Sequence, residues 1–353
     1  MTDLDDPAAL RAADPGGMLD AVVGLPAQLG EAYELGRAAP GLAPTDGVTS
    51  IAFCGMGGSA IAGDVIRAVY ADRLPVPMSM VRAPELPAHC GPATLVVASS
   101  YSGDTAETLA LFDEAVARGC RVVAVTSGGR LAARAAEAGA ACLAVPGMLA
   151  MPRAAFGSLA LAPVGALAAM GLVPDAAADI EEAEAALRSV LAACGPPVPT
   201  AANPAKSLAR WIADRVPVIW GAEGVAAVAA DRWRTQFNEN AKSPALSAAL
   251  PELDHNEVVG WSQGRGRGFV LVALRHHAEH PEVAARFPLS IDIARASGLE
   301  AEEIWASDGS PLAVVLELAL RGDLTTTYLA IARGIDPTPI DAIARLKRAL
   351  ADA

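Results

Sequence analysis

The chain has 353 residues, more than one ordinary hydrophobic core accommodates, so two domains are expected. Its formal net charge is −13 and no basic stretch stands out, which argues against a nucleic-acid-binding protein. No uninterrupted apolar run reaches about 18 residues, and the acidic N-terminus is unlike a signal peptide, so we expect no membrane segment and a cytoplasmic location. Five cysteines without a CxxC pair favour buried free thiols over disulfides or a zinc site.

The first half of the chain predicts a parallel sheet covered by helices. Residues 1–45 have a mainly helical pattern. Short apolar runs then alternate with amphipathic or alanine-rich stretches, as in βαβ units. The predicted strands are Ile51–Phe53, Pro77–Val81, Leu95–Ala98, Val122–Val125 and Cys142–Val145, and the predicted helices are Ile61–Tyr70, Glu107–Arg118 and Leu131–Ala138.

A second α/β half follows a linker rich in proline and glycine. Asp175–Ala193 predicts an acidic helix, and residues 194–204 predict the linker. The expected domains are therefore 1–173, a helix and linker over 174–204, and 205–353. In the second half the predicted strands are Val216–Trp220, Phe269–Leu274 and Ile304–Ala306, and the predicted helices are Val225–Phe237, Pro281–Ser297, Leu312–Ala332 and Pro339–Leu350.

Two turns rich in glycine and serine follow neighbouring strands of the first half. In residues 51–64 a strand leads through glycines to Ser59, in the first turn of a helix. In residues 96–108 another strand leads to Ser99, Ser100 and Ser102, and Thr105 opens the next helix. Free N–H groups at a helix N-terminus attract anions, and hydroxyls add further donors. The pair of turns predicts a phosphate site.

A dinucleotide site is the alternative interpretation of the first turn. Residues 55–60 fit a loose G-x-G-x-x-A pattern. Such a site usually has an acidic residue at the end of the next strand, where this chain has Arg82 and reaches an acid only at Glu85. NADP would tolerate Arg82, but the second serine turn has no role in a dinucleotide site, so phosphosugar binding is favoured.

Polar residues of the remaining chain supply candidates for proton transfer. Glu239 ends a predicted helix, and His255 follows sixteen residues later within a polar cluster. A carboxylate that reaches C1 and C2 of a sugar, with a histidine that opens the ring, would suit an aldose–ketose isomerase. Arg153 precedes an apolar helix and could stabilise an enediolate oxygen. A solvated Glu239, a structural His255 and a surface Arg153 are the alternatives, and His89, His276, His277 and His280 are expected at the surface.

At these residues the sequence resembles the bifunctional phosphoglucose/phosphomannose isomerase family, within the sugar-isomerase (SIS) superfamily. The similar blocks occur in order from about residue 50 to the C-terminus. They are GMGGSAIAGD (55–64), SYSGDTAETL (100–109), PRAAFGSL (152–159), NENAKSPA (238–245), ELDHNEVVGW (252–261) and RGIDPTPIDAIARLK (333–347).

The resemblance implies an α/β protein of two flavodoxin-like SIS subdomains, each a parallel sheet flanked by helices, in a homodimer with a shared active site. It implies interconversion of glucose 6-phosphate, mannose 6-phosphate or both with fructose 6-phosphate, without a metal or organic cofactor. Glu239 would shuttle the proton, Arg153 would steady the enediolate, His255 of the partner would help open the ring, and Lys347 would reach a ring oxygen or hydroxyl. The phosphate would bind Gly58, Ser59, Ser100, Ser102 and Thr105.

One departure from the family pattern affects the phosphate site. Asp104 stands where the family usually has asparagine, which places a carboxylate beside the expected phosphate. It would weaken anion binding unless its side chain turns away to cap a helix. For this reason a non-catalytic phosphosugar sensor remains an alternative to the isomerase.

Overall fold

The computed structural model describes residues 2–147, 149, 151–264 and 266–351. The chain forms two compact units. The serine-turn unit comprises Gly24–Leu187 and Gly309–Val315, and the Glu239 unit comprises Met1–Val23, Arg188–Asp308 and Leu316–Ala353. In this grouping the N-terminal 23 residues belong with the second half of the chain, and residues 309–315 belong with the first. The expected boundaries at 173 and 204 stay a prediction.

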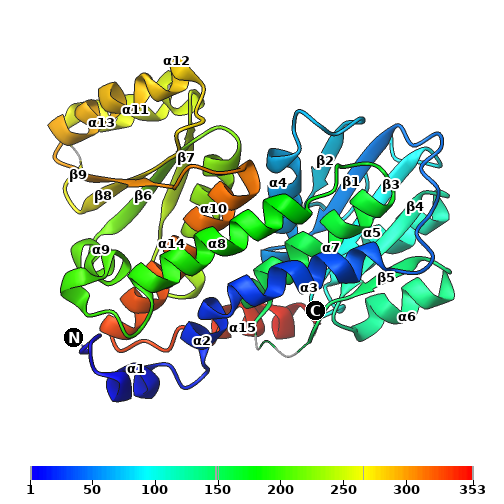
Figure 1. The fold of residues 1–353 in the computed structure, drawn as a ribbon, viewed down its shortest axis with the longest axis horizontal. Helices are drawn as coiled ribbons and strands as arrows, with labels where there is room; N and C mark the ends of the chain where they lie inside the picture. The colour runs from blue at the N-terminus through cyan, green and yellow to red at the C-terminus, as the bar shows by residue number, and fades with distance from the viewer. Residues whose placement is uncertain (1, 148, 150, 265, 352–353) are drawn as a thin grey trace. The chain divides into compact units, whose positions relative to one another are not determined.

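The serine-turn unit contains a five-stranded sheet that is parallel throughout (Figure 1). Its strand order is β2-β1-β3-β4-β5, the flavodoxin-like order. The five strands are β1 (Ser50–Gly55), β2 (Met78–Val81), β3 (Thr94–Ser99), β4 (Arg121–Thr126) and β5 (Ala141–Ala144). All five lie where the apolar runs predicted them. Three of them, β1, β3 and β4, are buried almost throughout and so are largely hydrophobic.

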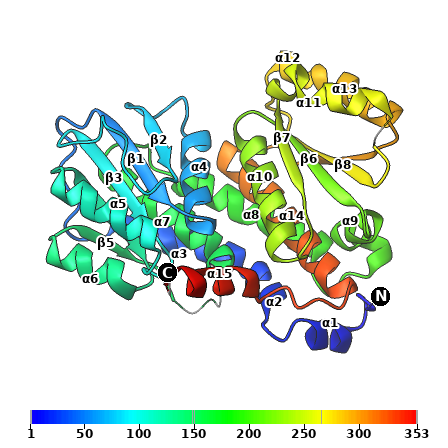
Figure 2. The same ribbon diagram turned by 180° about the vertical axis from the view of Figure 1, so that it is seen from behind.

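Helices cover both faces of this sheet, as Figures 1 and 2 show from opposite sides. On one face, apolar side chains of β1, β3 and β4 pack against α5 and α6. The other face carries α3, α4 and α7. The helices of this unit are α3 (Leu25–Arg37), α4 (Gly58–Val69), α5 (Ala106–Ala117), α6 (Gly129–Glu137), a 3-10 turn η1 (Pro152–Ala155), α7 (Phe156–Ala169) and the start of α8 (Ala177–Cys194).

One apolar segment of this unit also has the composition of a membrane span. By length and composition alone, the described residues Pro152–Ala169 could cross a bilayer, yet 83% of this segment is buried inside the structure. The central helix of a globular domain has the same properties. Here α7 packs along α3, and each of its residues from Phe156 to Leu167 is buried.

The Glu239 unit contains a second sheet, of four parallel strands in the order β7-β6-β8-β9. The strands are β6 (Val216–Ala222), β7 (Leu246–Leu250), β8 (Phe269–Arg275) and β9 (Glu300–Trp305). The predicted fold class, α/β with two parallel sheets flanked by helices, is confirmed. Two details were wrong: β7 was missed, and β9 begins four residues before the predicted Ile304.

Helix α10 (Val225–Glu239) packs along β6, β7 and β8, and α13 (Arg286–Ala296) packs against β9. The predicted helix 281–297 is divided into α12 (Pro281–Ala284) and α13, and the predicted linker ends where an unexpected helix, α9 (Pro204–Ile212), begins. The other helical elements are α1 (Pro7–Ala13), α2 (Met18–Val23), η2 (Thr200–Ala202), η3 (Glu252–His255), α11 (Glu257–Gly260), η4 (Trp261–Gln263), α14 (Pro311–Ala332) and α15 (Asp341–Ala351).

Candidate active site

The two serine turns meet at the switch point of the first sheet. Strands β1 and β3 are neighbours, and Gly55 pairs with Ser99 at their carboxyl ends. The helices that follow, α4 and α5, leave toward opposite faces, which opens a crevice between the two turns in folds of this topology. The predicted proximity of the turns is confirmed by a direct contact, because the backbone N–H of Tyr101 donates to Ser59 Oγ at 3.1 Å.

Hydroxyl groups of the second turn are arranged by short local hydrogen bonds. Ser100 Oγ donates to Thr105 Oγ1 at 2.9 Å, and the N–H of Asp104 donates to Ser102 Oγ at 3.3 Å. Ser59 and Ser100 are buried, whereas Ser102 is exposed. The turn therefore has fixed hydroxyls at its base and an accessible hydroxyl at its rim.

The two helices also begin in a way that suits an anion. Helix α4 begins at Gly58 and α5 at Ala106, and neither capping residue, Gly57 or Thr105, makes a side-chain hydrogen bond to its helix N-terminus. The first N–H groups of a helix have no partner inside the helix, and they carry partial positive charge. Thr105, which occupies the capping position of α5, has its hydroxyl engaged with Ser100 instead. In α4 the N–H groups of Ser59 and Ala60 already donate to carbonyls of the preceding turn. The N–H of Gly58 and the first N–H groups of α5 are therefore the candidate donors for a phosphate.

The carboxylate of Asp104 points to the next helix along the sheet. Its Oδ1 accepts from the backbone N–H of Arg130 at 3.3 Å and from Arg130 Nε at 3.0 Å, at the first turn of α6. The Arg130 guanidinium holds the pKa of Asp104 below its usual range, and the backbone hydrogen bond acts in the same direction. Asp104 thus turns toward a helix N-terminus and carries a cationic partner, which removes the main reason to expect weak anion binding.

Arg153 is buried, contrary to the surface alternative. It lies in η1 with an exposed fraction of 3%. Its backbone approaches the start of α4, since a Cβ placed on Gly58 would lie 3.3 Å from the backbone nitrogen of Arg153. The absence of a side chain at position 58 therefore permits the segment that carries Arg153 to lie against the first phosphate turn.

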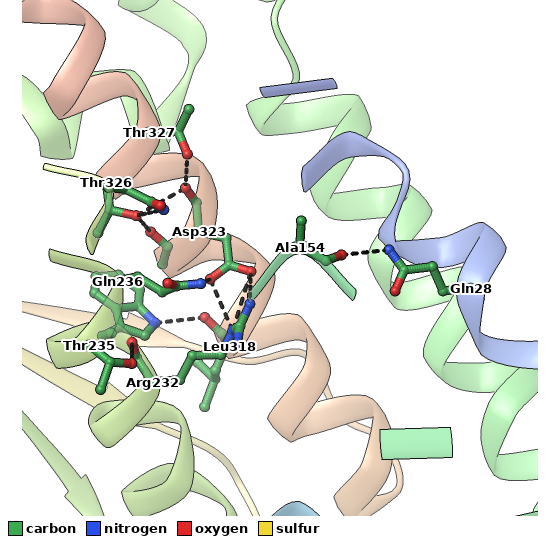
Figure 3. Close-up of polar contacts among 12 residues, drawn as sticks. Gln28, Ala154, Arg232, Thr235, Gln236, Leu318, Asp323, Thr326 and Thr327 are labelled. Atoms are coloured by element: carbon green, nitrogen blue, oxygen red, sulfur yellow. Dashed lines mark hydrogen bonds and ion pairs between the residues drawn. The ribbon is translucent and has the colours of Figure 1, made fainter. Parts of the chain in front are cut away.

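Two residues hold the segment on either side of Arg153. Gln28 of α3 donates through Nε2 to Ala154 O at 2.8 Å and accepts from the N–H of Ser158 at 3.1 Å, as Figure 3 shows in part. Tyr101 Oη lies 3.1 Å from both Pro146 O and Leu149 O. The sequence analysis assigned no role to either residue. Gln28 gave no sequence signal, whereas Tyr101 lies inside the SYSGD motif.

In the Glu239 unit, Glu239 lines a cavity of about 710 Å³. It is half-buried at the end of α10. The opposite wall comes from the segment 339–343 at the start of α15. The lining residues are Asn238, Glu239, Lys242, Ser243, Pro244, Pro339, Ile340, Asp341, Ala342 and Ile343. A carboxylate therefore borders a space of the size that a hexose derivative requires.

A buried polar ladder fixes α10, and with it Glu239, against α14. Arg232, Gln236 and Asn240 recur every four residues along one face of α10. Arg232 donates to both carboxylate oxygens of Asp323, at 3.0 Å from Nε and 2.7 Å from Nη2, and Gln236 donates to Asp323 Oδ1 at 3.1 Å (Figure 3). Asn240 donates to Thr326 Oγ1 at 3.1 Å. These contacts determine the rotation of α10 about its axis.

The structure does not place His255 or Lys347 in the described lining of this cavity. His255 is exposed at the end of η3, just after the carboxyl end of β7, while Glu239 precedes the amino end of that strand. The two side chains therefore lie toward opposite edges of the second sheet. Lys347 belongs to α15. Their roles stay predictions.

Two further observations concern histidines and metals. His276 is buried, with 8% exposure, so the expectation that it lies at the surface was wrong; it directly follows β8 and its N–H donates to Glu279. Among the described residues, no group of three or more His, Cys, Asp or Glu side chains has the geometry to hold a metal ion. All five cysteines are free, and Cys120 and Cys142 are only half-buried.

Comparison with known proteins decides the family. Residues 46–156 match the SIS domain model, and residues 201–350 match the model of the bacterial phospho-glucose isomerase C-terminal SIS domain. A bifunctional phosphoglucose/phosphomannose isomerase of Caldicellulosiruptor bescii is 34% identical over 95% of this chain and 99% of its own length. The chain belongs to the bifunctional phosphoglucose/phosphomannose isomerase family. This confirms the resemblance found in the sequence.

The chain is also similar to a sugar-phosphate epimerase in sequence and to a solved structure in fold. A D-glucosamine-6-phosphate 4-epimerase of Sulfolobus acidocaldarius is 28% identical over 90% of this chain and 94% of its own. A hypothetical protein of Thermus thermophilus has a solved structure that superposes with a TM-score of 0.72 at 20% identity, covering 98% of this chain and 93% of that one. At that identity the structural match establishes the fold alone.

Proposed function

We propose that this member of the family is a phosphosugar isomerase that interconverts glucose 6-phosphate, mannose 6-phosphate or both with fructose 6-phosphate. The observation that carries the proposal is the pair of joined serine turns at the switch point of the first sheet. Glu239, which borders a cavity, and the activity for which the Caldicellulosiruptor bescii relative is named support it.

The serine-turn unit would bind the phosphate. In this proposal Gly58, Ser59, Ser100, Ser102 and Thr105 surround it, and the N-termini of α4 and α5 add backbone donors. The site needs no lysine, because hydroxyls and oriented N–H groups are sufficient for a dianion. Such contacts are the same in substrate and transition state, so they set KM more than kcat.

Glu239 would carry out the proton transfer. Its carboxylate removes the proton from C2 of the open-chain aldose, which leaves an enediolate, and then returns the proton to C1. The hydroxyl proton of O2 moves to O1 in the same interconversion, which gives the ketose. Glucose and mannose differ in configuration only at C2, so both give the same enediolate. Arg153 would balance the negative charge that develops on the oxygen.

His255 would act from a second copy of the chain. Within one chain it lies toward the opposite edge of the second sheet from Glu239. We therefore propose a homodimer with a shared active site, in which His255 of the partner helps open the sugar ring while Lys347 contacts a ring oxygen or hydroxyl. The dimer would work in the cytoplasm. Light scattering would test the oligomeric state, and a monomer with full activity would contradict it.

The decisive experiment compares Glu239→Gln with a matched control. Glu239→Gln should lower kcat for fructose 6-phosphate by about 10²–10⁴-fold, the range for loss of a general base. Glu223→Gln changes an exposed glutamate at the other edge of the same sheet and should leave kcat unchanged. Wild-type protein without turnover of any hexose 6-phosphate, or an active Glu239→Gln variant, would overturn the proposal.

The same purified protein can be used to test two alternative functions, an epimerase and a non-catalytic sensor. The similarity to a D-glucosamine-6-phosphate 4-epimerase suggests epimerisation at C4 as an alternative reaction. NMR of the product formed from glucosamine 6-phosphate would reveal it. A non-catalytic sensor would bind hexose phosphate in a calorimeter without turnover. Asp104 motivated the sensor, and its pairing with Arg130 removes that motive.

A further inference from the structure

We propose that Lys242 is a positioning residue that fixes the Glu239 end of α10 to the opposite wall of the cavity. This inference rests on the proposed function of Glu239 as the base. Lys242 lies three residues after Glu239, lines the same cavity and belongs to a different unit from the serine turns.

The backbone of Lys242 adopts a conformation that is unusual for a lysine. Its φ is +52°, the left-handed region, which side chains other than glycine enter at a cost of about 1–2 kcal/mol. The turn closes when the N–H of Ser243 donates to Phe237 O at 3.0 Å. Glycine is the usual residue at such a position after a helix. A lysine here is therefore tolerated at the expense of local strain.

The ammonium group contacts both walls. Lys242 Nζ donates to Glu239 O at 2.6 Å and to Pro337 O at 2.9 Å. Glu239 O belongs to the last turn of α10, where carbonyls lack helical partners and attract cations. Pro337 lies two residues before Pro339, which begins the opposite wall. One side chain thus connects the residue that carries the proposed base to the segment that faces it.

This connection should matter for rate more than for substrate binding. A base must lie within hydrogen-bond reach of the carbon-bound proton, and a displacement of about 1 Å can cost about 10²-fold in rate. The proposed phosphate contacts belong to the other unit and do not involve Lys242. Loss of the ammonium group should therefore lower kcat while KM stays nearly constant.

Three substitutions at Lys242 distinguish the effect of its ammonium group from the effect of its strained backbone. Lys242→Gly relieves the left-handed strain and removes the side chain, Lys242→Met keeps most of the aliphatic stem, and Lys242→Arg keeps a cation. Ala213→Gly is the matched control, because Ala213 also has a positive φ, +48°, and lies outside the cavity. Each variant is assayed for kcat, KM, melting temperature and amide hydrogen exchange.

We expect kcat to fall by about 10–100-fold in Lys242→Gly and Lys242→Met, with KM within about twofold and partial recovery in Lys242→Arg. Lys242→Gly and Ala213→Gly should match or exceed the wild-type melting temperature. Exchange should accelerate at residues 238–243 and 338–343 only in the Lys242→Gly and Lys242→Met variants.

Unchanged kcat in Lys242→Gly and Lys242→Met, or an equal loss in Ala213→Gly, would overturn the inference. Unchanged exchange at both walls would overturn it as well, whatever the activity. If wild-type protein does not turn over hexose phosphates, the proposed function fails while the exchange measurement still decides whether Lys242 connects the two walls.

Discussion

Four strands of the first sheet and the four strands of the second have the same order, but the two sheets differ at their switch points. In the serine-turn unit, β1 and β3 end in turns that carry hydroxyls and lead into helix N-termini without a side-chain bond from the capping residue. In the Glu239 unit, β8 ends at Arg275, which is buried and paired with Glu279 and Glu303. The Arg275 guanidinium also lies near the rings of Phe287 and Trp305, at 3.8 and 4.4 Å from their centroids.

This difference shows that a shared strand order does not imply a shared ligand site. At the carboxyl end of β8 the second sheet carries an internal ion pair, and its acidic side chains would repel a phosphate. The proposed base of that unit instead lies toward the amino edge, at the end of α10. The proposed phosphate site therefore lies at a switch point, whereas the proposed base lies at a helix end.

The largest expected effect is on stability, and it comes from removing the buried ion pair of Arg275 and Glu279 at the end of β8. Arg275→Met would leave Glu279 with a buried, unpaired charge, since its side chain is only 2% exposed. We expect a loss of about 3–5 kcal/mol in the free energy of unfolding, measured by urea titration. Arg275→Met/Glu279→Leu should recover most of that loss. A single variant that is as stable as wild type would contradict the view that this pair stabilises the carboxyl end of β8.

An effect of intermediate size is expected from alanine substitution at two equivalent glycines, one in each unit. Gly57 precedes α4 and Gly224 precedes α10, both with positive φ and with no atom within 4 Å of the point where a Cβ would lie. Alanine at either position should cost about 1–3 kcal/mol of stability. Only Gly57→Ala should raise KM for fructose 6-phosphate, by about tenfold, because its methyl group would intrude on the phosphate. An equal rise of KM in Gly224→Ala would remove the functional distinction.

The smallest effect concerns Asp104. Because Arg130 lowers its pKa in the folded chain, the ionised carboxylate adds stability above its unfolded pKa of about 3.8, and this is lost as the pH falls through the lower folded pKa. The stability difference between wild type and Asp104→Asn in urea titrations should therefore shrink from about pH 5 to pH 3. KM at neutral pH should change less than about twofold. A tenfold lower KM in the variant would show that the carboxylate repels substrate.

The sequence predicted the buried parts of the fold better than its edges. Central strands such as β3 and β8 are continuous apolar runs because both faces are covered. The edge strands β7 and β9 are largely exposed or half-buried and contain alanine or glutamate. For this reason β7 was missed and only the end of β9 was predicted. Helix α9 was missed although Asn203 caps it and Pro204 begins it, a recognisable start signal inside a segment taken for a linker.

For the site, local motifs were informative and long-range contacts were not. The serine turns and the start of α5 could be predicted because turn residues follow strands in sequence. The partner of Asp104 lies 26 residues away, and Gln28 contacts Ala154 across 126 residues, so no periodicity reveals either. Lys242 was visible inside NENAKSPA, but its positive φ and its contact with Pro337 depend on the folded turn.

The ion pair between Asp104 and Arg130 restricts which residues can occupy these two positions in relatives. A carboxylate at 104 is compatible with an anion site only while position 130 supplies a cation, so the two positions form a compensated pair. A chain with asparagine at 104 is free to lose Arg130, whereas a chain with aspartate is not. We therefore expect the identity of residue 104 to constrain residue 130 across relatives, and Arg130→Met to be more harmful to phosphate binding here than in the Asp104→Asn background.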